Sequence, residues 1–251
     1  MAINVQEHLE RYPEWAKSAV VVLSGGMDSA IAARMTVEKY GAENVHALSF
    51  FYGQKQSAEL ECAKEIVKTL GVAKHQVIDI RFLGEIVKGA TALVDDSVHE
   101  MPDAEEVGDE IQPITYVPSR NVIFLAIAAS YAESNNLDLL VTGALSMECS
   151  EWDATADFIH RMNDVLCLNR KNKIRAYSPL LHLSKSTGIE ILRKMDGNID
   201  LLKNTLTCYN PHDGGVSCGV CVSCGDRIKG FKGAGVKDPI EYAVEINWEG
   251  E

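Results

Sequence analysis

The sequence predicts an α/β fold in which a parallel sheet is covered by helices on both faces, followed by a small cysteine-rich unit. Short apolar runs that end at glycine or other turn residues alternate with longer stretches of helical periodicity. This alternation is typical of parallel sheets, because each crossover helix returns the chain to the same edge of the sheet. The cysteines gather near the C-terminus, after the last of these elements.

Four apolar runs are expected to be strands, at residues 19–24, 45–50, 75–80 and 137–142. The first, AVVVLS, ends in two glycines, and Gly143 ends the fourth, as is typical of short buried strands. The expected helices are residues 28–40, 56–70, 121–134, 155–168 and 185–195. Gly41 is a plausible end for the first of them. The acidic stretch 95–112 lacks periodicity and is expected to be a surface loop.

The charge and the apolar pattern exclude several classes of protein. With 24 Lys plus Arg against 36 Asp plus Glu, the net charge of −12 disfavours broad nucleic-acid binding, which usually needs a basic face. No apolar run is long enough to span a membrane. The start, MAINVQEHLERYPEW, lacks the basic and apolar regions of a secretory signal. We therefore expect a cytoplasmic protein without a membrane partner.

The string SGGMDS, which follows the first expected strand, predicts a phosphate-binding loop. Two glycines permit a tight turn close to an anion, and amides at a helix N-terminus favour phosphate. Both serines are expected to donate hydrogen bonds to phosphate, whereas Asp28 either caps the helix or holds Mg²⁺. The Walker A lysine is absent. The expected ATP-binding residues of this loop are Leu23, Ser24, Gly25, Gly26, Met27, Asp28 and Ser29.

Four of the seven cysteines follow the pattern C-x9-C-x2-C-x2-C. Four sulfurs form a closed ligand set that suits structural Zn²⁺, although an iron–sulfur cluster or free thiols are alternatives. Without a secretory signal, a metal is favoured over disulfides. The expected zinc ligands are Cys208, Cys218, Cys221 and Cys224, and the remaining cysteines (Cys62, Cys149 and Cys167) are expected to be small buried residues.

These features divide the chain into three expected parts. Residues 1–18 form an N-terminal extension, 19–203 an ATP-binding α/β domain and 204–251 a zinc-binding C-terminal region. The extension contains Leu9, Tyr12 and Trp15, and we expect it to form a short amphipathic helix packed on the body.

SGGMDS resembles the PP-loop signature of the adenine-nucleotide alpha-hydrolase superfamily, which implies a Rossmann-like, doubly wound parallel sheet. Such enzymes hold the pyrophosphate of ATP while an acid or carbonyl oxygen attacks the α-phosphorus, and a nitrogen or sulfur nucleophile then displaces AMP. Further strings resemble the 7-cyano-7-deazaguanine synthase (QueC) family across roughly residues 19–232. In chain order they are Tyr52-Gly53-Gln54, Tyr116-Val117-Pro118-Ser119-Arg120-Asn121, Gly143, Leu183-Ser184-Lys185 and Asn204-Thr205-Leu206-Thr207-Cys208-Tyr209-Asn210.

The resemblance implies an ATP-dependent carbon–nitrogen ligase that converts 7-carboxy-7-deazaguanine and ammonia to 7-cyano-7-deazaguanine through an amide. It also implies ATP with Mg²⁺, structural Zn²⁺ and a homodimer. Asp28, Arg120 and Lys185 are the expected catalytic residues, and Arg120 and Lys185 are also expected to bind ATP. A structural ion pair for Arg120 and an ordinary surface position for Lys185 are the alternatives.

Substrate binding is expected at Tyr52, Gln54, Trp152 and Asp153. Core packing for Tyr52 and capping of the next helix by Gln54 are the alternatives. The family carries a Tyr-Pro-Asp-Cys-Arg segment after the fourth strand, for which Trp152 and Asp153 stand in here, while the Pro, Cys and Arg are missing. We therefore expect that the deazaguanine acid binds but that residues 146–157 alter the next step, unless Arg161 supplies the missing charge.

Three other functions remain open at this point. A QueC-like enzyme of a phage or anti-phage defence system would transfer the activated acid to another amine, for example on a protein. A tRNA-modifying PP-loop enzyme is disfavoured by the acidic charge. A nucleotide-sensing zinc module is disfavoured because Asp28, Arg120 and Lys185 are all present.

Overall fold

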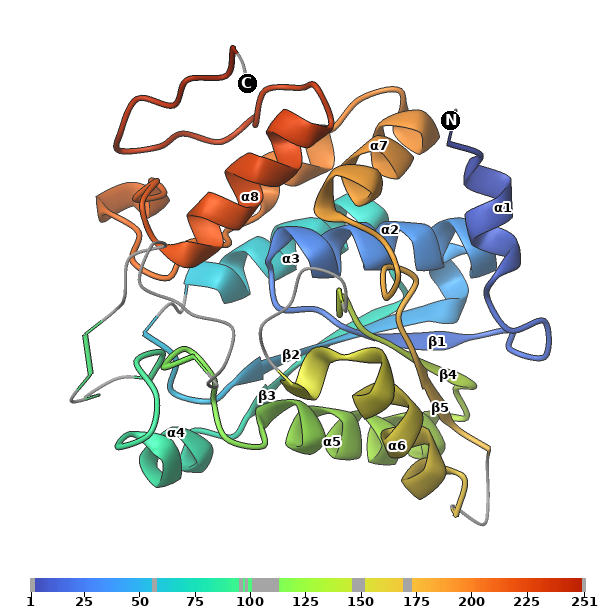
Figure 1. The fold of residues 1–251 in the computed structure, drawn as a ribbon. Helices are drawn as coiled ribbons and strands as arrows, with labels where there is room; N and C mark the ends of the chain where they lie inside the picture. Colours follow the sequence, from blue (N-terminus) through green and yellow to red (C-terminus); the bar gives the residue numbers. More distant parts are fainter. Residues whose placement is uncertain are drawn as a thin grey trace.

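A five-stranded parallel sheet in the order β3-β2-β1-β4-β5 forms the centre of the molecule (Figure 1). The structure is a computed structural model that describes residues 3–55, 58–94, 97, 99–100, 113–145, 152–168 and 173–249. Its strands are β1 (Ala19–Val22), β2 (Val45–Phe51), β3 (Lys74–Asp79), β4 (Leu139–Val141) and β5 (Arg175–Tyr177). The order and the parallel pairing confirm the predicted Rossmann-like, doubly wound sheet.

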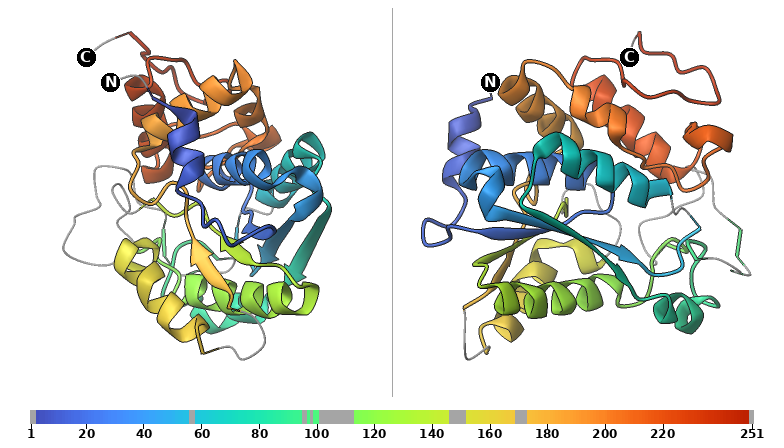
Figure 2. Two further views of the ribbon diagram at one scale, coloured as in Figure 1. Left: turned by 90° about the vertical axis from the view of Figure 1, so that its right-hand side faces the viewer. Right: turned by 180° about the vertical axis from the view of Figure 1, so that it is seen from behind.

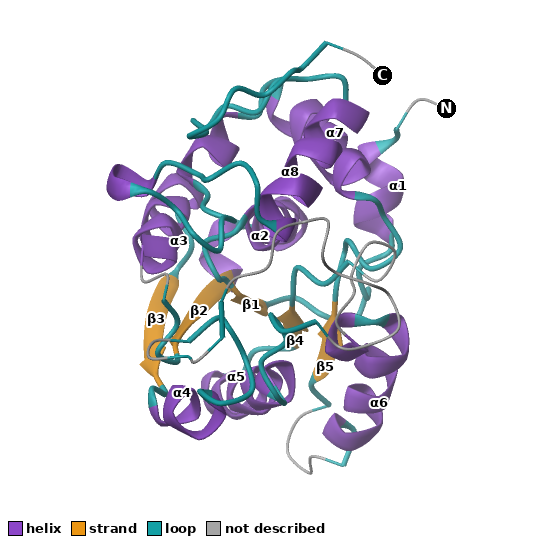
Figure 3. Cartoon of the chain, turned by 60° about the vertical axis from the view of Figure 1, so that its left-hand side comes forward, coloured by secondary structure: helices purple, strands orange, loops and turns teal. Residues whose placement is uncertain are grey.

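Helices cover both faces of this sheet (Figures 2 and 3). One layer contains α1 (Val5–Glu10), α2 (Met27–Tyr40), α3 (Ala58–Leu70), α7 (Lys185–Asp196) and α8 (Val222–Gly233). The opposite layer contains α4 (Phe82–Val87), α5 (Arg120–Asn135) and α6 (Ala156–Leu166). None of the helices within the described ranges is both long and apolar enough to cross a bilayer.

The central strand β1 is buried from both sides. Val21 packs in a cluster with Ile31 of α2 and Ile189 of α7, whereas Val20 packs in a second cluster with Leu125 of α5. Successive strand side chains point to opposite faces, so an almost continuous apolar strand is the sequence signature of this position.

The register brings the carboxyl ends of three strands to one edge. Val21 is level with Ala47 of β2 and with Val141 of β4, so the loops that follow β1, β2 and β4 all emerge together. In open parallel sheets this edge is where ligands bind. The loop after β1 is the predicted phosphate loop.

Three elements were not predicted from the sequence. Strand β5 is only three residues long and begins with a charged residue, Arg175. Helix α8 contains three glycines (Gly225, Gly230 and Gly233) and no clear apolar stripe, and α4 spans only six residues. Tertiary contacts rather than local pattern stabilise such elements.

The N-terminal extension packs on the body partly as predicted. Leu9 and Tyr12 are buried against the α2 side of the core. However, α1 ends at Glu10, and Trp15 is 49% exposed. The end of the helix is explained by Pro13, because a residue that precedes proline disfavours helical backbone angles.

Replacement of Gly143 by alanine is expected to destabilise the protein by about 1–3 kcal/mol. A Cβ at this position would lie 2.7 Å from the Ser29 amide nitrogen and 2.8 Å from the Asp28 carbonyl carbon. Gly188→Ala in α7 is the matched control, because its Cβ would lie 3.6 Å from the nearest side-chain atom. That variant should be neutral or more stable, since alanine favours helix. Equal denaturation midpoints for the two variants would contradict this packing.

Candidate active site

The turn from β1 into α2 takes the conformation that its glycines allow. Gly25 has φ +97°, and a Cβ there would collide with the backbone carbonyl oxygen of Glu59 in α3. The Gly25 carbonyl also accepts a hydrogen bond of 3.0 Å from the Leu206 amide. The turn is therefore held between the start of α3 and the segment that leads into the cysteine cluster.

The two loop serines shape the turn rather than only facing outward. Ser29 Oγ donates to the Gly26 carbonyl (3.0 Å) and accepts from the Ser24 amide (3.2 Å). Ser24 Oγ accepts from the Gly26 amide (3.1 Å) and lies 3.1 Å from Ser29 Oγ. Both hydroxyls thus already have partners within the turn, and their donation of hydrogen bonds to phosphate stays a prediction.

Helix α2 begins without a side-chain cap, which leaves its first turn open to a ligand. Gly26 is the N-cap residue, so the expectation that Asp28 caps the helix is wrong. Amides in the first turn of a helix have no carbonyl partner within it, and they carry the positive end of the helix dipole. This end of α2 therefore favours an anion, as predicted.

Asp28 instead pairs with a lysine from α7. Lys185 Nζ lies 3.0 Å from Asp28 Oδ2, and the two side chains are 12% and 23% exposed. The other oxygen, Asp28 Oδ1, is buried and has no hydrogen-bond partner among the described residues. A buried carboxylate oxygen without a donor fits a Mg²⁺ ligand, because Mg²⁺ prefers carboxylate oxygens.

Arg120 lies at the first position of α5, immediately after Ser119, whose backbone is left-handed (φ 57°). Its guanidinium carbon lies 5.9 Å from the centre of the Tyr52 ring. Burial alone would lower the pKa of Arg120, but the neighbouring Tyr52, Tyr209 and Asp153 raise it above its usual value. The guanidinium is therefore a permanent positive charge inside the site.

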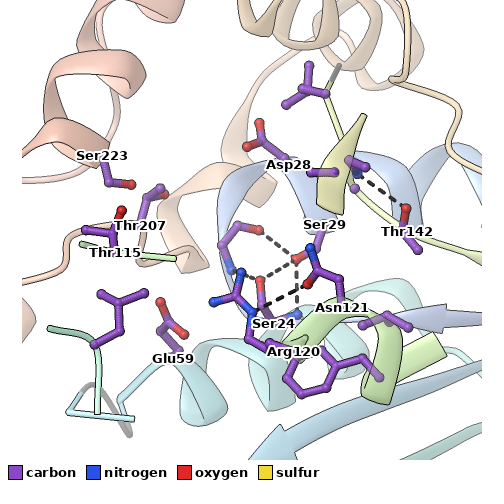
Figure 4. A pocket seen from close by; sticks show the side chains of 18 of the residues that line it. Ser24, Asp28, Ser29, Glu59, Thr115, Arg120, Asn121, Thr142, Thr207 and Ser223 are labelled. Atoms are coloured by element: carbon purple, nitrogen blue, oxygen red, sulfur yellow. Dashed lines mark hydrogen bonds between the residues drawn. The ribbon is translucent and has the colours of Figure 1, made fainter. Parts of the chain in front are cut away.

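A single pocket of about 340 Å³ brings these groups together (Figure 4). It is lined from three sides of the site: by the loops after β1, β2 and β4, by the first turns of α5 and α7, and by the segment around the cysteines. Every predicted ATP-binding residue except Gly25 lines it, namely Leu23, Ser24, Gly26, Met27, Asp28, Ser29, Arg120 and Lys185.

The predicted substrate residues divide into two groups. Tyr52, Gln54 and Asp153 line the pocket. The Gln54 amide is bound to the backbone, because it accepts from the Tyr52 amide (2.9 Å) and donates to the Phe50 carbonyl (3.1 Å). Trp152 is 62% exposed and is not among the lining residues. The binding of the substrate ring by Trp152 stays a prediction, and the exposed position of the side chain does not favour it.

The segment that departs from the family pattern is described only in part. Residues 146–151, including Cys149, lie outside the described residues. Arg161 points to the surface, where it pairs with Asp157 at 3.4 Å and both side chains are 74% exposed. It does not line the pocket, so the idea that Arg161 supplies the missing positive charge is not supported.

Sequence reasoning missed several lining residues, of which Glu59 is the clearest. It lies in the first turn of α3 and lines the pocket. Burial raises the pKa of its carboxyl to about 8, although the Arg120 charge opposes this shift. The sequence contained a signal for this residue, because Glu59 lies in the first turn of the helix that follows β2, at the edge of the sheet where ligands bind. Asn121, Thr207 and Ser223 were also missed.

The four predicted zinc cysteines form one buried cluster. The sulfurs of Cys208, Cys218, Cys221 and Cys224 all lie within 4.8 Å of one another. Tetrahedral Zn²⁺ with bonds of about 2.3 Å would place sulfurs roughly 3.8 Å apart, close to the 3.9 Å between Cys218 and Cys224. Amides of Asn210 and Cys218 donate to the Cys208 sulfur at 3.3 and 3.2 Å. The donor set fits a structural zinc ion.

The isolated cysteines differ from the expectation that they are buried. Cys167 is exposed at the end of α6, where its thiol donates to the Asp164 carbonyl at 2.9 Å. Cys62 is half-buried against the cysteine cluster.

Glu59→Gln is expected to stabilise the fold increasingly as the pH rises. The folded chain raises this pKa from 4.5 to about 8, so ionisation opposes folding between these values. The melting temperature of the variant minus that of the wild type should increase from pH 6 to 8 and level off above it. Glu61→Gln, at a side chain 73% exposed in the same helix, is the control. A difference for Glu59→Gln that does not change with pH would contradict the shift.

Comparison with known proteins agrees with the geometry. A family model described as "QueC: Queuosine biosynthesis protein QueC" matches residues 18–235. The 7-cyano-7-deazaguanine synthase of Sulfurimonas denitrificans is 42% identical over 230 residues, which cover 90% of this chain and 97% of that protein. The same-named protein of Coxiella burnetii is 36% identical over 236 residues, 92% of this chain and 100% of that protein.

Among solved structures, the NMN synthetase from Francisella tularensis matches with a TM-score of 0.47 and 19% identity, covering 80% of this chain and 74% of that one. The family model and the curated relatives each span most of the chain and confirm the resemblance seen in its motifs. The chain is therefore an enzyme that belongs to the QueC family of queuosine biosynthesis proteins.

Proposed function

We propose that this enzyme converts 7-carboxy-7-deazaguanine to 7-cyano-7-deazaguanine with ATP and ammonia. The observation that carries the proposal is the pocket, where an uncapped helix N-terminus, the Asp28–Lys185 pair and Arg120 surround one space. The names of the family and of the curated relatives support this choice of substrate. ATP-dependent activation followed by amidation fits these groups best.

In the first step, a carboxylate oxygen of the acid attacks the α-phosphorus of ATP and pyrophosphate leaves. The amides at the start of α2 and the Lys185 ammonium would stabilise the charge that develops on pyrophosphate. The permanent charge of Arg120 would bind the carboxylate or the α-phosphate. Asp28 would orient Lys185 and, through its unpartnered oxygen, hold Mg²⁺, which neutralises phosphate charge when bound.

In the second step, ammonia attacks the acyl carbon and AMP leaves, which gives the amide. Ammonia must lose a proton as the carbon–nitrogen bond forms. The Glu59 carboxyl lines the pocket and would accept this proton in its ionised form, whose population grows as the pH rises towards the raised pKa of about 8. Conversion of the amide to the nitrile removes the remaining oxygen, so a second adenylation of that oxygen is required.

The zinc ion is proposed to be structural. Four thiolates close its coordination sphere and leave no position for substrate. The cluster joins α8 to the segment that contains Leu206, whose amide binds the phosphate loop at Gly25. Its role is thus to hold one wall of the pocket. Assembly as a homodimer stays a prediction.

Incubation of the enzyme with ATP, the deazaguanine acid and ammonia should yield the nitrile, AMP and pyrophosphate, detected by mass spectrometry. Lys185→Ala should lower the rate on the order of 100-fold, because a charge aimed at the leaving group is lost. Lys203→Ala is the control, since Lys203 forms an exposed pair with Asp200. Release of ADP without AMP would refute the proposal. If the adenylate or the amide accumulates and no nitrile forms, the result would instead favour an enzyme that transfers the activated acid to an amine other than ammonia.

Elemental analysis should find one zinc per chain, and Cys218→Ser should lose it. Because structural zinc contributes folding free energy, that variant should melt at a lower temperature and bind ATP more weakly through the displaced pocket wall. The exposed Cys167→Ser serves as the control and should keep both the metal and the stability. Iron in place of zinc, or no metal in the folded wild type, would contradict the assignment.

A further inference from the structure

A buried ion pair lies directly behind the pocket, outside the chemistry described above. Arg227 of α8 donates to both oxygens of Asp238 at 2.6 and 3.0 Å, and the two side chains are 1% and 0% exposed. The Tyr242 hydroxyl also donates to Asp238, at 2.7 Å. Asp238 and Tyr242 come from the tail beyond residue 235, where the match to the family model ends.

The same arginine also reaches two threonines on the segment before the cysteines. Its Nη1 donates to Thr205 Oγ1 at 2.8 Å and to Thr207 Oγ1 at 2.9 Å. Thr207 lines the pocket, whereas Thr205 does not. The two threonines therefore share one donor and differ in access to the pocket.

This arrangement determines the direction of the Thr207 hydroxyl. A guanidinium has donors only, so the Thr207 oxygen accepts and its proton remains to be donated. Thr205 donates its proton to the Leu202 carbonyl at 2.7 Å. For Thr207, no acceptor is seen among the residues that the structure describes. We infer that Asp238 and Arg227 are positioning residues that aim the Thr207 hydroxyl into the pocket as a hydrogen-bond donor to the bound ligand.

The ligand atom that fits this donor is a ring nitrogen or carbonyl oxygen of a purine-like ring. Figure 4 shows the Thr207 side chain apart from those of Ser24 and Ser29, although the preceding Leu206 contacts the phosphate loop at Gly25. This donor is assigned to a ring rather than to the pyrophosphate, for which the amides of α2 are already available. This step rests on the proposed function, under which two such rings enter the pocket. They are the adenine of ATP and the deazaguanine of the acid.

The inference is tested by calorimetry, in which the binding of ATP and of the deazaguanine acid is measured separately. With only one substrate present in each titration, no reaction takes place. Thr207→Val should weaken one of the two ligands roughly tenfold and leave the other nearly unchanged, since one hydrogen bond is lost. The weakened ligand identifies which ring receives the bond. Thr207→Ser keeps the hydroxyl and should bind like the wild type. Asp238→Asn should weaken the same ligand as Thr207→Val.

Thr205→Val is the matched control, because it removes a hydrogen bond from the same Arg227 nitrogen but no pocket hydroxyl. It should lower the melting temperature at least as much as Thr207→Val, because its hydrogen bond to the Leu202 carbonyl is lost as well, while it binds both ligands normally. Equal binding losses in the two valine variants, or no loss in either, would overturn the inference. If Thr207→Val does not fold, Thr207→Ala replaces it. Failure of the proposed function would show separately, as a wild type that binds ATP but forms no nitrile.

Discussion

The phosphate loop is held between two backbone surfaces that leave no room for a side chain. On one side, Gly25 lies against the Glu59 carbonyl of α3, and on the other, Gly143 lies against the first turn of α2. These contacts hold the phosphate loop directly against the start of α3 and against the residue that follows the end of β4. The Gly25 contact explains why Glu59, which is distant from the loop in the sequence, lines the same space, and the ion pair with Asp28 brings Lys185 there.

The electrostatics of the site follow from that arrangement. A chain with a net charge of −12 must bind a polyanion, so positive potential has to be local. It comes from the amides of α2 and from Arg120 and Lys185, each partly or fully withdrawn from water. Burial strengthens such interactions relative to those at the surface. The same burial keeps Glu59 protonated near neutral pH, which limits the negative charge in the pocket.

The sequence was most informative where local pattern and function coincide. The buried run before SGGMDS, Gly41 at the end of the following helix and the cysteine spacing each meet a strict backbone or geometric requirement, and each has the expected role in the structure. The sequence did not predict contacts between residues that are far apart in the chain. Neither the partner of Asp28 nor the use of both loop serines within the turn can be read from spacing. Trp152 was expected at the pocket from its place in the chain, yet its side chain is exposed.

The C-terminal part of the chain completes the pocket rather than standing apart from it. The Leu206 amide binds the phosphate loop, and Thr207 and Ser223 line the cavity. Each of these two residues is followed directly by a cysteine of the cluster, Cys208 or Cys224. The central claim is that ATP is attacked at its α-phosphorus by an oxygen of the acid. The most direct test uses acid labelled with ¹⁸O in its carboxylate and mass spectrometry of the nucleotide released. The account predicts AMP that carries ¹⁸O, whereas label in inorganic phosphate with unlabelled nucleotide would contradict it.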